Sequence, residues 1–223
     1  MRARLWGWVI GMSLIWGTQG MGKVGVFWVS EPVQPGDVVM LYGGGLREVS
    51  AVRLSRLPDA PVKAPFVRPS PSSSGKALKV TILQGDDACL KFVLPEGLKQ
   101  GVFKVVVGDK TVFLNRPKVE WCQPTSLLPG MRENEAAPGQ TVQVIGRNFL
   151  LEGGEGAKAQ VALVNSQGKA ILLKPTKVEK YSLLVPLPSN LPLGEYEVWV
   201  HNGFGGQEGW GGGVRLRVRQ PEK

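Results

Sequence analysis

The stretch Gly-Glu-Tyr-Glu-Val-Trp-Val at residues 194–200 decides the fold, together with the similar stretch Gly-Val-Phe-Lys-Val-Val-Val at residues 101–107. In the later stretch Tyr196, Val198 and Val200 alternate with two glutamates and a tryptophan. Successive side chains of a β-strand point to opposite faces, so this alternation puts one apolar face toward a core. Both stretches are therefore predicted to be half-buried antiparallel strands.

Earlier signals precede each of these stretches in the same order. Pro35-Gly36 and Pro138-Gly139 each come directly before an apolar run, and Gly43 and Gly146 follow seven residues after the glycine of each pair. A Pro-Gly pair favours a tight turn, because proline fixes φ and glycine accepts conformations that other residues resist. The pattern indicates an internal repeat with one copy in each half of the chain.

The repeat predicts an all-β fold of two modules, residues 24–117 and 118–219, each the size of an immunoglobulin-like (Ig-like) β-sandwich. A stretch rich in proline and serine, residues 58–75, is predicted to be a long loop in the first module. About seven strands are expected in each module. The expected strands are 24–29, 37–42, 49–54, 78–83, 89–94, 101–107 and 111–114, followed by 118–121, 140–146, 159–164, 169–174, 178–185, 194–201 and 213–219.

The composition agrees with this fold class and narrows the chemistry. Among 223 residues there are 30 glycines and 17 prolines, yet 43% of the chain is hydrophobic, which argues against both disorder and a helical bundle. One histidine and two cysteines cannot form a His-rich metal site or a zinc site, so no metal and no cofactor are predicted. No nucleophile or marked carboxylate pair accompanies the histidine, so the chain is not predicted to be an enzyme.

Residues 1–20 have the layout of a secretory signal peptide. Arg2 and Arg4 precede an apolar run from Leu5 to Trp16, and Thr18 and Gly20 provide small residues at cleavage positions. An uncleaved membrane anchor is the alternative. We expect an exported protein, secreted, periplasmic or on the cell surface, with no transmembrane segment in the mature chain. The formal charge of +9 makes the protein basic, but export argues against nucleic acid as a partner.

The second module resembles the IPT/TIG family of Ig-like domains. The resemblance rests on Pro138-Gly139, on the run Val-Gln-Val-Ile-Gly-Arg-Asn-Phe at residues 142–149 and on Leu-Gly-Glu-Tyr-Glu-Val at residues 193–198. It implies an interaction or spacer module. Residues 27–36, and residues 198–203 followed by Gly209-Trp210, are in turn similar to the accessory region that precedes the right-handed β-helix in some exported bacterial pectate-lyase-like proteins. This resemblance implies an association with polysaccharide degradation.

A glycine-rich stretch, residues 201–213, is the candidate ligand site. Saccharides are bound by exposed aromatic rings with polar groups at the rim, and this stretch and the strand before it contain both. The alternative is that the two tryptophans pack inside the protein and shape the loop. The candidate ligand-binding residues are Trp199, His201, Asn202, Phe204, Glu208 and Trp210.

Three further patterns each have a functional and a structural interpretation. Arg215, Arg217 and Arg219 share one strand face. They form either a patch for acidic polysaccharide or a solvated surface.

Export permits a disulfide between Cys89 and Cys122, although Cys89 is also typical of a small buried residue. Trp28 and Trp121 stand at equivalent module starts, where we interpret them as pinning the first strand to the core or the module junction.

Together these patterns predict a non-catalytic exported binding or spacer module associated with polysaccharide recognition or with a polysaccharide-degrading enzyme. Its expected partner is an acidic polysaccharide such as pectin, or another exported protein. The alternative is a structural or protein-interaction module of the cell envelope without affinity for glycans.

Overall fold

The computed structural model describes residues 23–60, 62 and 77–222. The predicted signal peptide, residues 1–20, and most of the predicted loop 58–75 lie outside the described residues. The described chain is all-β, with only short 3₁₀ helices between its strands, so the predicted fold class is confirmed. The 3₁₀ helices are η1 (Leu46–Glu48), η2 (Gly156–Lys158) and η3 (Gly206–Gly209).

The first module is a sandwich of two four-stranded antiparallel sheets. One sheet has the order β1 (Gly25–Val29), β2 (Val38–Gly44), β6 (Cys89–Val93) and β5 (Ile82–Gly85). The other has the order β4 (Leu78–Val80), β3 (Val52–Arg56), β7 (Phe103–Val107) and β8 (Lys110–Leu114).

The second module has the same strand order with one strand added. Its first sheet is β9 (Lys118–Pro124), β11 (Thr141–Arg147), β15 (Ser182–Pro186) and β14 (Lys177–Val178). Its second sheet is β13 (Ala170–Leu173), β12 (Gln160–Asn165), β16 (Gly194–His201), β17 (Gly211–Val218) and β10 (Glu135–Ala136). The added strand, β10, pairs in parallel with β17.

Each sandwich encloses its own hydrophobic core, because the inward residues of both sheets are apolar. On β7, Phe103, Val105 and Val107 are fully buried, and on β16 Val198 and Val200 are fully buried. These are residues that the alternation assigned to the core face. The apolar side chains of a strand thus explain why each half of the chain closes into a sandwich.

The glycines that the sequence places at equivalent positions have equivalent structural roles. Gly36 and Gly139 adopt φ of 93° and 82° in the turns before β2 and β11, a region that favours glycine. Gly43 lies against the carbonyl oxygen of Gly25, and Gly146 lies against that of Lys118, so closely that a Cβ would overlap the oxygen. The first strand of each module can therefore approach the second only where the second has a glycine.

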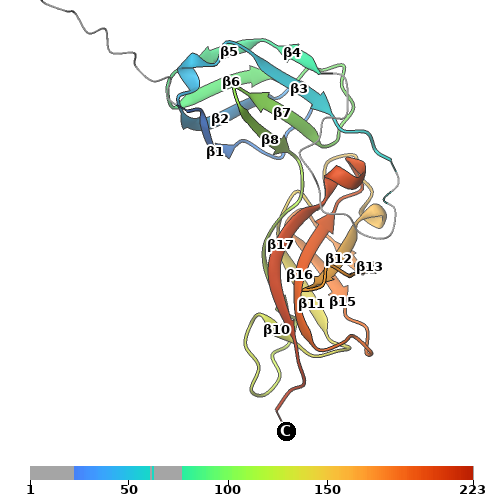
Figure 1. Cartoon of the computed structure of the whole chain (residues 1–223). Helices are drawn as coiled ribbons and strands as arrows, with labels where there is room; N and C mark the ends of the chain where they lie inside the picture. The colour runs from blue at the N-terminus through green and yellow to red at the C-terminus, as the bar shows by residue number, and fades with distance from the viewer. Residues whose placement is uncertain (1–22, 61, 63–76, 223) are drawn as a thin grey trace, which may run out of the picture.

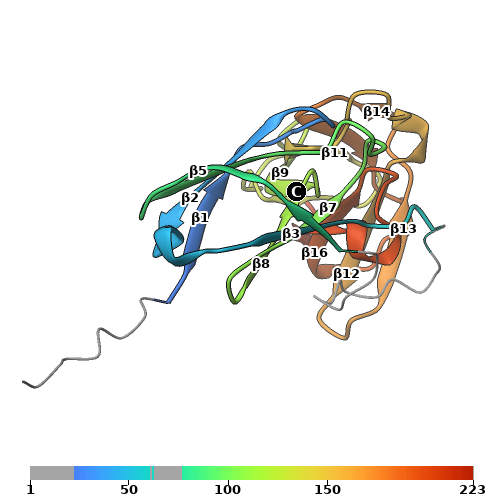
Figure 2. The same ribbon diagram turned by 90° about the horizontal axis from the view of Figure 1, so that it is seen from above.

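The two sandwiches lie end to end, and the chain passes from one to the other between the end of β8 and the start of β9 (Figure 1). Seen from above, the sheets of the first module cross over those of the second (Figure 2). Buried Asn115 lies in this connection, where its side chain accepts a hydrogen bond from Val33 N (2.8 Å) and donates to Val33 O (2.7 Å) and Gly101 O (3.0 Å). These bonds fix the start of the linker to the first module.

Candidate functional site

The glycine-rich stretch 201–213 lies at the junction of the two modules and is largely buried there. The Trp210 ring is 0% exposed, and His201 and Asn202 are also buried. The prediction that Trp210 offers an open aromatic surface to a ligand is wrong, whereas His201 and Asn202, although nearly buried, line a hollow of about 540 Å³. A buried indole provides no plane for a sugar ring. The Trp210 ring packs with Ala162 and Val164 of β12, while Gly205 of the loop bonds to Asp59 of the first module.

His201 is held by the loop that follows it. Gly203 N–H donates to Nδ1 (3.0 Å), so Nε2 carries the proton and contacts the carbonyl oxygen of Gly206 at 2.8 Å. The Trp210 ring lies beside the imidazole, with 5.2 Å between the ring centroids. Burial lowers the pKa of His201 below its ordinary value, which favours the neutral ring. The arrangement stabilises the turn and offers no base to a substrate.

Direct hydrogen bonds join this loop to the linker and to the first module. The Asn202 side-chain amide donates to the carbonyl oxygens of Asn115 (3.0 Å) and Asn148 (2.8 Å). Gly205 N–H donates to the carboxylate of Asp59 (3.0 Å), which also forms an ion pair with Arg56. The stretch is therefore a docking element between the sandwiches.

The other predicted ligand residues are half-buried and do not meet at one surface. Phe204 lines the hollow that His201 and Asn202 also line, beside Lys158 and Asp59. The charge of Glu208 acts on Arg116 in the linker. Trp199 donates its indole N–H to the carboxylate of Glu197 (3.1 Å), and it lines a second cleft. Of the predicted residues, Trp199 is the one in the site described below.

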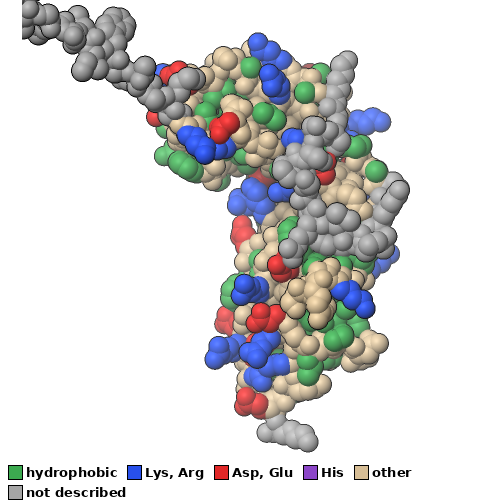
Figure 3. Space-filling model, viewed as in Figure 1, with side chains coloured by type: hydrophobic (Ala, Val, Ile, Leu, Met, Phe, Trp, Pro, Cys, Tyr) green, Lys and Arg blue, Asp and Glu red, His purple; other side chains and the backbone are tan. Residues whose placement is uncertain are grey.

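The three arginines of β17 and its extension point outward as predicted, but acidic residues accompany them. Arg215 and Arg217 are the register partners of Glu197 and Glu195 on β16. Arg219 Nε donates to Glu135 (2.7 Å), and this bond lowers the pKa of the glutamate. On the visible face of the second module, basic and acidic side chains lie interspersed (Figure 3). This surface is one of mixed charge, and it does not form the predicted basic patch.

The predicted disulfide is absent, since both cysteines are free. Cys89 begins β6 in the first module, whereas Cys122 on β9 belongs to the core of the second module and is 0% exposed. Burial raises the pKa of the Cys122 thiol to about 12, so the thiol stays protonated. Each cysteine belongs to a different sandwich, which is why they do not pair.

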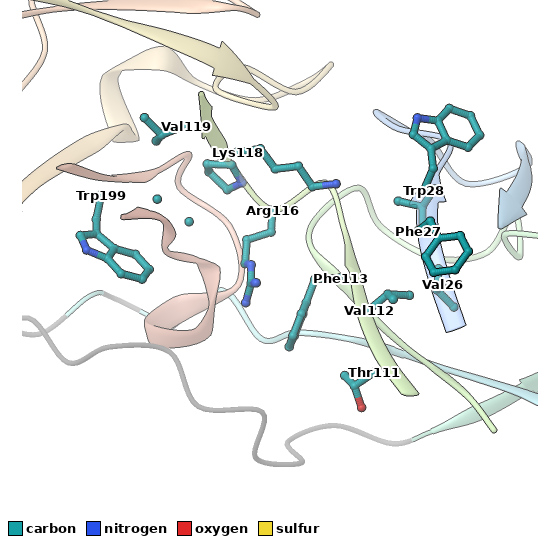
Figure 4. Close-up of a pocket in the computed structure, with 14 residues that line it drawn as sticks. Val26, Phe27, Trp28, Thr111, Val112, Phe113, Arg116, Lys118, Val119 and Trp199 are labelled. Atoms are coloured by element: carbon teal, nitrogen blue, oxygen red, sulfur yellow. The ribbon is translucent and has the colours of Figure 1, made fainter. Parts of the chain in front are cut away.

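A cleft of about 500 Å³ opens between the modules and is the best candidate for a binding site. Figure 4 shows Phe27 and Trp28 of β1 at one side and Trp199 of β16 at the other, with Phe113 and Arg116 between them. Lys118, Thr111 and the backbone of Gly211 and Gly212 complete its polar lining, together with the apolar residues Val26, Val29, Val112, Pro117 and Val119. Both modules and the linker thus contribute to one cavity.

The aromatic residues of β1 are unusually accessible. Phe27 is 77% exposed and Trp28 is 43% exposed. A β-bulge between Val26 and Trp28 breaks the alternation of β1, so two consecutive aromatic residues are exposed. The exposure of Trp28 and of Trp121, which is 40% exposed, contradicts the interpretation that they pin the first strand to the core, whereas Trp28 does lie at the module junction, where it lines the cleft.

Two cations stand at the centre of the cleft. The Arg116 guanidinium lies over the Phe113 ring, 4.1 Å from its centroid, in a cation–π contact. Burial lowers the pKa of Arg116, while Glu31 and Glu208 raise it. Lys118 forms an ion pair with Glu31, whose side chain is 0% exposed. The carboxylate of Glu31 therefore lies behind the surface that a ligand would meet.

Sequence reasoning missed Phe27, Phe113, Arg116 and Lys118 as site residues. The pair Phe27-Trp28 was a usable signal, because adjacent aromatic residues on a half-buried strand cannot both face the core. Among the residues described here, no group of three or more His, Cys, Asp or Glu side chains is placed to hold a metal ion. No helix within the described ranges has the length and hydrophobicity of a membrane span.

No family model and no curated protein matches the chain. Similar solved structures include a proposed DNA binding protein of Bacteroides vulgatus ATCC 8482, 12% identical over 86% of this chain and 73% of that one, with a TM-score of 0.38. SGBP-B from a xyloglucan utilization locus of Bacteroides uniformis is 14% identical over 89% of this chain and 49% of that one, with a TM-score of 0.31.

A third similar structure is SGBP-B from the mixed-linkage glucan utilization locus of Bacteroides ovatus, in complex with a heptasaccharide. It is 16% identical over 84% of this chain and 40% of that one, with a TM-score of 0.24. The chain thus spans about half or less of the length of both SGBP-B proteins. All three TM-scores are below 0.5, so the proposals below rest on the residues of this chain.

Proposed function

We propose that this chain is a non-catalytic saccharide-binding module of an exported protein and that the cleft between its two sandwiches is the binding site. The observation that carries the proposal is the presence of aromatic side chains on both sides of one cavity, the exposed Trp28 from the first module and the half-buried Trp199 from the second. The apolar face of a pyranose ring packs on such rings while its hydroxyls bond to polar groups at the rim.

The size and lining of the cleft support this use. A volume of about 500 Å³ is within the range of small-ligand sites. Arg116, Lys118 and Thr111 provide hydrogen-bond donors along the lining. The fourteen lining residues include no Asp, Glu, His or Cys, so the cleft has none of the paired carboxylates that glycoside hydrolysis uses. This lining favours binding without turnover.

A spacer function without affinity for glycans is the second candidate, and the buried loop supports it. The bond from Gly205 to Asp59 and the bond from Asn202 to Asn115 tie the loop of the second module to the first module and to the linker, which is what a rigid spacer needs. The two candidates differ in whether the exposed rings have a ligand.

A comparison of two matched tryptophans tests the proposal. Trp28 and Trp121 are almost equally exposed, on β1 and β9, but only Trp28 lines the cleft. We expect the purified two-module protein to be retarded in affinity gels that contain a polysaccharide. The Trp28→Ala substitution should lower the affinity for this polysaccharide by at least about tenfold. Trp121→Ala should bind like the unmodified protein.

The test uses a panel of neutral glucans and acidic polysaccharides, including pectin. An equal loss of polysaccharide affinity in the Trp28→Ala and Trp121→Ala variants would exclude the cleft as the binding site. No retardation with any polysaccharide would overturn the proposal and leave the spacer function. Circular dichroism spectra of both variants would verify that they are folded.

A further inference from the structure

We infer that the cleft selects saccharides that carry a carboxylate, such as uronic acids, and that the Arg116 guanidinium is the group that binds this carboxylate. The inference rests on the proposed function, since it names the ligand class of the same site.

The charged residues that line the cleft are all cations. Arg116 and Lys118 are the two charged side chains among the lining residues. Their acidic partners lie outside the lining: the Glu31 side chain is buried, and Glu208 belongs to η3. A ligand in the cleft therefore meets positive charge without a facing carboxylate. Charge complementarity of this kind favours an anionic ligand.

Arg116 is also held in position before any ligand arrives. Its side chain stacks on the Phe113 ring, and its backbone carbonyl oxygen accepts a hydrogen bond from the Asn148 side chain (3.0 Å). A guanidinium whose face lies on an aromatic ring can still donate from its edge. The planar edge matches the two oxygens of a carboxylate, which gives a bidentate and charge-assisted bond.

Lys118 is the weaker of the two anchors, because it already forms an ion pair with Glu31. Arg116 feels the charges of Glu31 and Glu208, but neither one forms an ion pair with it within 4 Å in the described residues. The guanidinium thus provides the positive charge that a ligand can use.

The aromatic rings distinguish a saccharide from other anions. Phe27, Trp28 and Trp199 give the cleft apolar walls on both sides of the cations. A uronic acid presents an apolar ring face and a carboxylate in the same residue, so it can use the walls and Arg116 together. An acidic peptide offers the carboxylate without the ring face.

The test measures binding of four probes to the purified protein by isothermal titration calorimetry. The probes are a galacturonic acid hexamer, its methyl ester, a neutral glucose hexamer and polyglutamate. We expect the free acid to bind at least about tenfold more tightly than the ester, because esterification removes the charge-assisted bond. The Arg116→Gln substitution should lower the affinity for the free acid by a similar factor and should change the affinity for the ester little.

Arg53→Gln is the matched control, since Arg53 is an exposed arginine on β3 that does not line the cleft. It changes the net charge equally and should alter binding less than about twofold at physiological ionic strength. If Arg116→Gln fails to fold, Arg116→Lys replaces it. That variant keeps the charge but loses the planar edge, and it should also weaken binding of the free acid.

The possible outcomes separate the inference from the proposed function. If the glucose hexamer or the ester binds as tightly as the free acid and Arg116→Gln has no effect, the inference is wrong and the saccharide function stands. If polyglutamate competes as well as the uronate, the site takes acidic peptides and the inference is also wrong. If no probe binds, both proposals are overturned.

Discussion

His201 is a buried imidazole whose two nitrogens are both engaged by backbone groups. Since Gly203 N–H occupies Nδ1, a second proton on the ring would displace this bond. The ring also lies beside Trp210 and away from water. Asp59 is the acidic group whose charge favours protonation, and burial outweighs it.

We predict that the free energy of unfolding decreases as the pH falls below about 6.5. The pKa of His201 is below 6.5 in the fold, so the unfolded chain binds the proton first and acid favours unfolding. Above this pH the stabilisation is complete. The titration of one histidine changes the free energy of unfolding by at most about 1.4 kcal/mol per pH unit. Urea unfolding between pH 7.5 and 5.5 measures this slope.

The same series with His201→Gln is the control. His201 is the single histidine of the chain, and carboxylates titrate at lower pH, so the variant should have a nearly flat profile in this range. A slope that is the same in both proteins would contradict the assignment.

At the scale of the element, the approach of the first strand to the second depends on one glycine in each module. Gly43 has the carbonyl oxygen of Gly25 against its Cα, whereas a Cβ on the next residue, Gly44, would have nothing within 4 Å. The two neighbours lie on the same strand, β2, and differ in what surrounds them.

We predict that Gly43→Ala destabilises the protein by about 2 kcal/mol or more, since a methyl group there forces β1 away from β2. Gly44→Ala should change stability by no more than about 0.5 kcal/mol. Denaturant unfolding of both variants measures the difference. Equal effects would mean that the contact with β1 does not determine the choice of glycine.

Most strands could be predicted from the sequence because alternation is a local property. The strands β6, β7 and β16 start or end within two residues of their expected limits. The predicted single strand at 78–83 is instead two strands, β4 and β5, which belong to different sheets. The predicted strand at 178–185 is likewise divided into β14 and β15. The two-residue strand β10 has no periodicity, so the sequence could not indicate it.

At the scale of the whole molecule, the relation between the sandwiches depends on contacts that no local pattern encodes. The glycine-rich loop was predicted to bind a ligand because its aromatic and polar residues suit one. Trp210 is buried in a small core cluster with Ala162 and Val164 of β12, and no pattern within the loop indicates these contacts. The cleft could not be predicted either, since it combines β1, the linker and β16, which are far apart in the sequence.

We predict that Asn202→Ala lowers the free energy of unfolding by about 2–4 kcal/mol. The substitution leaves the carbonyl oxygens of Asn115 and Asn148 without their hydrogen bonds in a buried junction. Asn165→Ala is the matched control, because the hydrogen bonds of Asn165 lie in the exposed turn between β12 and β13. This substitution should lower the free energy of unfolding by less than about 1 kcal/mol. A smaller loss for Asn202→Ala than for this control would contradict the docking function of the loop.

The central claim is that one ligand contacts both modules in the cleft, and the four tryptophans at 28, 121, 199 and 210 report on it directly. A ligand titration followed by the ¹H–¹⁵N indole signals should shift the signals of Trp28 and Trp199 with one affinity. The signal of Trp121, which lies outside the cleft, should not move, whereas the signal of buried Trp210 can follow that of Trp199, which packs against its cluster. Shifts at Trp121 without shifts at Trp28 and Trp199 would contradict the claim.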